Sequence, residues 1–218
     1  MAIGTFEELR TAVKDWMVAD DISDVAFANF VQLAEARMNR ELKVRNMYAV
    51  TDAQTFATTG KDALPADFVE IVTLVLDGSP TSTVLAYIAP QQIVGLISTT
   101  YPGTPRQYTI IGNDIQVFPT PTEAAAYSMN YLRSLPALAL TGTTTNWLLE
   151  KAPDLYLYAT LLEAAIYLQD DAEAQRAQQL YERGKESLMA ADARSRNRPW
   201  ARMIPNISGS YDSRFRIV

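Results

Sequence analysis

The chain of 218 residues contains no cysteine and no histidine. These absences exclude disulfides, cysteine nucleophiles, Cys/His zinc sites and any Ser-His-Asp arrangement. Any catalysis would depend on carboxylate, lysine, tyrosine or serine side chains alone. The nearest approach to a metal site is Asp20, Asp21 and Asp24, which lack the glycine and terminal glutamate of a calcium loop and suit helix capping better. We therefore predict no catalytic residue, no cofactor and no metal ligand.

We expect no segment that would direct the chain into a membrane. Its start, MAIGTFEEL, has neither the basic region nor the apolar run of a signal peptide. The most apolar long segment, residues 146–171, is too short and too acidic to span a bilayer comfortably. We therefore expect no membrane partner, and a protein that stays in the cytoplasm of the cell that makes it.

Two segments near the N-terminus have apolar residues at helical spacing. Thr5 and Glu8 form a capping-box pattern ahead of a stripe that ends near Val18, and Ser23 or Asp24 can cap the next helix. The buried stripe of the first helix is expected to be Phe6, Leu9, Val13, Trp16 and Met17. That of the second is expected to be Phe27, Phe30, Val31, Ala34, Met38 and Leu42, with Glu35 largely off this face.

The segment at 146–171 predicts the central helix of a helical core. Pro153 and Asp154 suit the first turn of a helix, and apolar residues then occur on nearly every side, through Ile166 and Leu168. Asp170-Asp171 should end this helix and begin the last one, whose periodicity stops after Asp192. Its inner stripe is expected to be Ala174, Ala177, Leu180, Tyr181, Leu188 and Ala191.

Between Met47 and Leu132 the pattern changes to β-branched and aromatic residues separated by turn residues. It predicts strands at 47–57, 68–76, 82–87, 106–111, 114–118 and 125–132. The predicted fold class is α+β, mainly an α-helical bundle of about four long helices with a β-rich insertion and an extended C-terminal arm. The helical core would comprise 1–46 and 133–193, the insertion 47–132 and the arm 194–218.

Charge is distributed unevenly between the body and this arm. Residues 194–218 contain six arginines and one acid, Asp212, so they carry +5 and the rest of the chain −11, for a net charge of −6. An acidic body argues against broad nucleic-acid binding, and aromatic groups among the arginines favour a protein groove over DNA. The expected partner-binding residues are Arg194, Arg196, Arg198, Trp200, Arg202, Tyr211, Arg214, Phe215 and Arg216.

Three stretches together resemble the head-to-tail adaptor (connector) proteins of short-tailed bacteriophages. They are LAEARMNRELKVRNM at 33–47, LPADFVEI at 64–71 and NWLLEKAPDLYLYATLLEAAIYLQDD at 146–171. The resemblance implies a structural virion protein without catalysis, in a dodecameric ring between the portal and the downstream tail (nozzle) protein. DNA would pass through its channel during genome ejection without specific binding.

The resemblance also implies a location in the virion neck or tail, after assembly in the host cytoplasm. It implies further that the arm docks on the portal or on a neighbouring subunit. The alternative from the residues alone is a cytoplasmic enzyme or small-ligand-binding protein with a helical core and a β lid. A ring in solution would favour the adaptor, and a stable monomer with a deep polar pocket would favour the alternative.

Overall fold

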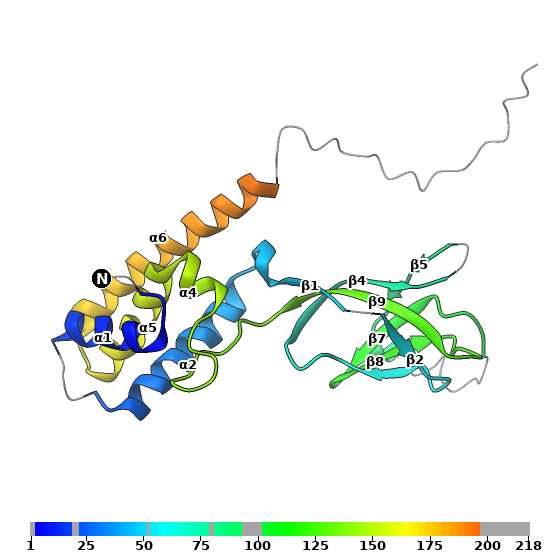
Figure 1. Ribbon diagram of the computed structural model, residues 1–218. Helices are drawn as coiled ribbons and strands as arrows, with labels where there is room; N and C mark the ends of the chain where they lie inside the picture. The colour runs from blue at the N-terminus through cyan, green and yellow to red at the C-terminus, as the bar shows by residue number, and fades with distance from the viewer. Residues whose placement is uncertain (1–2, 19–21, 52, 79–80, 93–101, 197–218) are drawn as a thin grey trace, which may run out of the picture.

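The computed structural model describes residues 3–18, 22–51, 53–78, 81–92 and 102–196, of which 46% are helical and 24% lie in strands (Figure 1). The helices are α1 (Phe6–Met17), α2 (Asp24–Glu41), η1 (Arg45–Met47), α4 (Trp147–Lys151), α5 (Pro153–Tyr167) and α6 (Asp171–Arg196). The strands are β1 (Tyr48–Val50), β2 (Gln54–Phe56), β3 (Lys61–Ala63), β4 (Phe68–Leu76), β5 (Thr83–Val84), β6 (Ala86–Tyr87), β7 (Gln107–Ile111), β8 (Asp114–Phe118) and β9 (Ala125–Arg133). None of the described helices is long and apolar enough to cross a membrane.

The prediction of a mainly helical bundle is wrong. Only four of the described helices are long, and two β-sheets build a second hydrophobic core that shares no described buried residue with the helical one. Figure 1 shows the helices gathered at one end of the molecule and the strands at the other. The physical reason is that each sheet has an apolar face, and two such faces can cover each other without help from a helix. We call the two parts the helical unit and the β unit.

The helical unit is organised around α5. This helix contacts α1, α2, α4 and α6, and nine of its fifteen residues are buried. Gly184 of α6 faces α5, where an added Cβ would lie 3.4 Å from the Leu155 side chain, in van der Waals contact. The predicted burial fails at the C-terminal end of α5, where Ile166 and Leu168 are exposed. Trp16 of α1, also predicted to be buried, is about half exposed beside the Tyr158 ring.

The predicted starts of the first two helices are confirmed. The Thr5 hydroxyl accepts a hydrogen bond from the Glu8 amide, and the Glu8 carboxylate accepts one from the Thr5 amide, so both halves of the capping box are present. α1 ends at Met17 with Val18 in the left-handed conformation. The Ser23 hydroxyl accepts from the Ala26 amide and begins α2.

The β unit consists of two sheets. One has the order β1-β9-β4-β5, with β2 also paired to β9, and the other has the order β3-β8-β7-β6. All strand pairs are antiparallel except β6 with β7. Alternate residues of β9 point into the core between the sheets, and the Tyr127 ring stacks on Phe56 with centroids 3.9 Å apart. The predicted strands at 68–76 and 114–118 match β4 and β8.

We expect Leu161→Ala to lower the free energy of unfolding by about 2–5 kcal/mol, because it leaves a cavity in the middle of α5, where Leu161 is 1% exposed. Urea denaturation followed by circular dichroism measures this loss. Met189→Ala on the exposed side of α6 is the control and should change the value by less than about 0.5 kcal/mol. Equal effects of the two substitutions would contradict the central position of α5.

Candidate functional site

The two units are joined by polar contacts along the segment that leads from β9 to α4, residues 134–146, which we call the connector. The Leu135 amide donates to Asn39 Oδ1 at 2.7 Å, and the Leu138 amide donates to Glu35 Oε1 at 2.8 Å. Glu35 and Asn39 lie one turn apart on α2, on the same side of the helix. Together these two side chains hold the connector along α2.

Glu35 is the centre of a buried hydrogen-bond network. Its side chain is 5% exposed, and Tyr156 of α5 donates to Glu35 Oε1 at 3.0 Å. Asn146 donates to the Tyr156 hydroxyl at 2.6 Å and accepts from the amides of Leu148 and Leu149 at the start of α4. The network therefore connects α2, α4, α5 and the connector.

Burial dominates the electrostatics of this network. It raises the pKa of Glu35 to about 7, although the Leu138 amide and the Tyr156 hydroxyl favour the carboxylate by hydrogen bonding. Burial and the neighbouring Glu35 charge raise the pKa of Tyr156 well above its usual value.

The sequence-based placement of Glu35 off the buried face is wrong. A carboxylate at this helical position is normally solvated, but here the connector amide and the tyrosine replace water.

A second polar cluster lies where α2 meets α6. Glu41 Oε2 accepts from Lys185 at 2.8 Å and from the Tyr181 hydroxyl at 3.0 Å. Burial alone would raise the pKa of Glu41, but the Lys185 ammonium and the Tyr181 hydroxyl hold it below its usual value. This cluster pairs its charges and leaves no free nucleophile or base.

Further contacts join the β unit to the helical unit. Lys43 pairs with Glu70 of β4, and the Arg45 amide donates to Asp192 Oδ1 of α6 at 3.0 Å. The Ser134 amide at the end of β9 donates to the Asp67 carbonyl at 2.7 Å. The chain thus enters and leaves the β unit through hydrogen-bonded segments.

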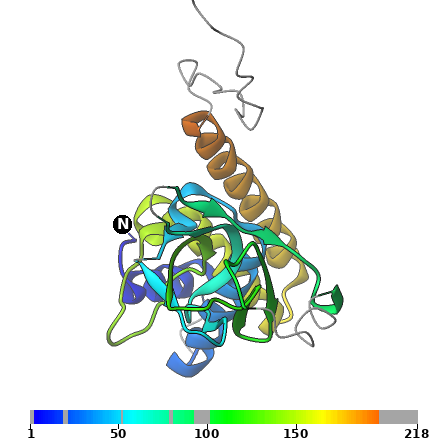
Figure 2. The same cartoon turned by 90° about the vertical axis from the view of Figure 1, so that its right-hand side faces the viewer.

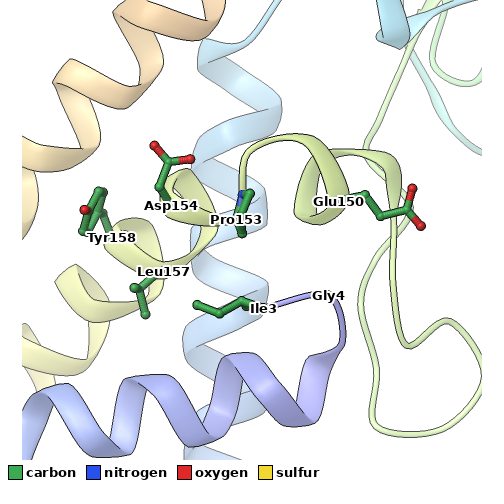
Figure 3. A pocket seen from close by; sticks show the side chains of 7 residues that line it. All are labelled: Ile3, Gly4, Glu150, Pro153, Asp154, Leu157 and Tyr158. Carbon is green, nitrogen blue, oxygen red and sulfur yellow. The ribbon is translucent and has the colours of Figure 1, made fainter. Parts of the chain in front are cut away.

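Figure 3 shows a surface hollow of about 570 Å³ between α1, α4 and α5. Its walls are largely apolar, formed by Ile3, Pro153, Leu157 and Tyr158. The carboxylates of Glu150 and Asp154 point in different directions in this view and do not converge on a common point. Among the described residues, no group of three or more carboxylates could hold a metal ion. This geometry suits contact with another molecule better than acid–base catalysis.

The predicted partner-binding residues are placed only in part. Arg194 and Arg196 lie in the last turn of α6, so the predicted extended conformation is wrong for these two. Arg194 Nε donates to the Ala190 carbonyl at 3.2 Å, and Arg196 pairs with Asp192 at 2.8 Å. Arginines favour a helix C-terminus, which explains why α6 continues past Asp192. The other seven, Arg198, Trp200, Arg202, Tyr211, Arg214, Phe215 and Arg216, lie outside the described residues.

Sequence reasoning missed the connector-binding pair Glu35 and Asn39. A signal was present, because both are polar residues one turn apart inside the first stretch that carries the family resemblance. Their partners are backbone amides, which a sequence pattern does not identify.

Comparison with known proteins gives one family. The family model described as SU10 adaptor protein matches residues 4–203, which include both units. No curated protein matches the chain.

We expect Glu35→Gln to change how stability depends on pH. The folded-state pKa of about 7 lies above the value of 4.5 for an unperturbed glutamate, so folding takes up a proton and Glu35 favours the folded state at low pH. This contribution is complete below pH 4.5 and is lost as pH rises through 7. Relative to the wild type, the Gln variant should therefore gain about 3 kcal/mol between pH 4.5 and pH 8.

Urea denaturation at several pH values between 4.5 and 8 measures this difference. Glu41→Gln is the control of opposite sign, because the lowered pKa of Glu41 gives wild-type stability that is lost as pH falls. Parallel pH profiles of the wild type and Glu35→Gln would contradict the assignment.

Proposed function

Because the chain belongs to the SU10 adaptor protein family, a family of phage head-to-tail adaptors and not of enzymes, we propose that it forms a ring between the portal and the tail and leaves a channel for DNA. The observation that carries this proposal is the match over residues 4–203. It spans the helical unit and the β unit, so the likeness does not rest on one helical motif. The family places the protein among the structural proteins of the virion neck, in association with portal and tail proteins.

The architecture supports a role that needs more than one partner. The molecule has two separate hydrophobic cores, and Figure 1 shows the helical unit and the β unit that contain them at opposite ends. Each unit can present its own surface without changing the packing of the other. An adaptor between two different structures requires this independence, whereas an enzyme requires side chains that converge on one point.

α6 carries the chain away from the body. It has only two buried residues in 26, and Figures 1 and 2 both show its C-terminal end leading away from the rest of the helical unit. In the proposed assembly, the segment that follows Arg196 binds the portal. Its arginines pair with carboxylates, and Trp200, Tyr211 and Phe215 anchor the contact.

The charge of the body is consistent with a DNA channel. The chain up to residue 193 carries −11, which repels a phosphate backbone and disfavours holding the passing duplex. The proposed partners are therefore the portal, the tail nozzle protein and further copies of this chain in a dodecameric ring. DNA passes through without specific contacts.

We expect a chain shortened after Arg196 to keep its melting temperature and to lose binding to the purified portal. The body retains both hydrophobic cores, because the described core residues all precede Asn197. Co-sedimentation with the portal measures binding, and circular dichroism measures melting. A shortened chain that unfolds would show that the segment belongs to a core, and one that still binds would place the portal contact elsewhere.

Two sets of substitutions separate the physical contributions to this contact. Replacing Trp200, Tyr211 and Phe215 by Ala should abolish binding at every salt concentration. Replacing Arg198, Arg202, Arg214 and Arg216 by Gln should weaken binding mainly at low salt, because salt screens charge pairs. Identical salt profiles for the two sets would contradict the proposed roles.

A further inference from the structure

Three consecutive apolar residues lie exposed where α5 turns into α6. Ile166, Tyr167 and Leu168 are 55%, 64% and 38% exposed. Gln169 follows in the left-handed conformation with φ of 58°, and α6 begins two residues later. A run of exposed apolar residues is unfavourable in water unless another surface covers it. We call these three residues the apolar corner.

An apolar hollow of about 340 Å³ lies between α2 and the connector. It is lined by Phe6, Asp24, Val25, Ala28, Asn29, Leu138, Ala139 and Leu140. Asp24 is its only charged lining residue, and Arg10 neutralises it through an ion pair of 2.6 Å. Val25 and Leu140 are 74% and 46% exposed at its rim. We call this hollow the connector groove.

The corner and the groove lie on opposite sides of α2. On one side, Glu35 and Asn39 hold the connector that forms a wall of the groove. On the other side, the centroids of the Phe30 and Tyr167 rings lie 5.3 Å apart, and Arg37 pairs with Glu163 of α5 at 2.7 Å. The buried row through Ala34 and Met38 separates these two sides.

The outward face of α2 between the two sides is uncharged over most of its length. The uncharged part runs from Val25 to Ala36 and is formed by Val25, Ala28, Asn29, Gln32, Leu33 and Ala36, and the exposed Arg40 follows on the same face in the last turn of α2. A solvent-facing helix surface usually carries charged residues, whereas the centres of protein interfaces are depleted of them. The uncharged surface therefore extends from the groove across α2 towards the corner.

We propose that the apolar corner of one copy of this chain inserts into the connector groove of the next copy. This inference rests on the proposed ring and specifies its subunit contact. An apolar projection and an apolar hollow at different places on one chain form a heterologous contact, which propagates from copy to copy and closes into a ring when the rotation permits. Because the two surfaces lie on opposite sides of α2, each copy uses both at once.

Two variants that block opposite halves of the contact test this inference. Ala28→Arg fills the groove with a charge and leaves the corner intact. The double substitution Ile166→Arg with Leu168→Arg charges the corner and leaves the groove intact. All three positions are exposed, so folding should persist, and Ser187→Arg on exposed α6 adds the same charge elsewhere as the control. If Ala28→Arg melts early, Leu140→Arg blocks the same groove from the connector side.

Sedimentation velocity, alone and with the purified portal, gives the mass of each species. The wild type and Ser187→Arg should form the multi-copy oligomer, and each blocking variant alone should be a monomer. An equimolar mixture of the two blocking variants should give a dimer of one copy each and nothing larger, since only one intact corner–groove pair is available.

Three other results would each contradict a different part of this proposal. Variants that still form the wild-type oligomer show that these surfaces are not subunit contacts. Blocking variants that remain monomers when mixed show that the corner and the groove meet other partners, such as the portal or a tail protein. A wild type that stays monomeric with and without portal contradicts the proposed ring itself.

Discussion

A helix that is apolar on almost every side has to be enclosed, and α5 imposes this requirement on the helical unit. Nine of its fifteen residues are buried, and α1, α2, α4 and α6 each cover part of it. Burial of large apolar side chains contributes about 1.5–3 kcal/mol each, so the enclosure is the main source of stability here. Where α5 is not covered, its apolar residues are exposed on the surface. At the end of α5, where the chain turns into α6, Ile166, Tyr167 and Leu168 are exposed to solvent.

Burying the Glu35 carboxylate costs free energy, and its hydrogen bonds offset only part of that cost. Desolvation of a carboxylate is unfavourable, and the raised pKa records that the charged form remains disfavoured. In return, Glu35 accepts from the Leu138 amide, which would otherwise be buried without a partner, and from the Tyr156 hydroxyl, which also accepts from Asn146. A neutral apolar residue at this position would remove the acceptor of the Leu138 amide, and of the pair only Asn39 would still hold the connector along α2. Glu35 therefore positions the connector on α2 more than it contributes to the free energy of unfolding.

The sequence predicted individual elements better than it predicted their assembly. The cap at Thr5, the strand at 68–76 and the start of α5 at Pro153 follow from local chemistry, and all three are confirmed. The second core was missed, since pairing of sheets depends on contacts between residues far apart in the chain. β3 was missed because Lys61, Asp62 and Ala63 have low strand propensity, and β3 exists by pairing with β8. The burial of Glu35 escaped prediction because its partners are a backbone amide and a distant tyrosine. Helical periodicity does not show which turns of a helix a neighbour covers, so it did not predict the exposure of the apolar corner.

The connector and the α2 side chains that hold it affect both the packing of one copy and the contact between copies in the proposed ring. Leu138 takes part in both, because its amide is held by Glu35 and its side chain lines the connector groove. Asn39 fixes the connector one turn further along α2, just after β9 leaves the β unit. A partner that enters the groove therefore contacts a wall whose position is set by these hydrogen bonds. In a ring built through this groove, the spacing of neighbouring helical units would depend in part on this polar network. In that ring, Glu35 and Asn39 would influence the contact between copies without touching the partner.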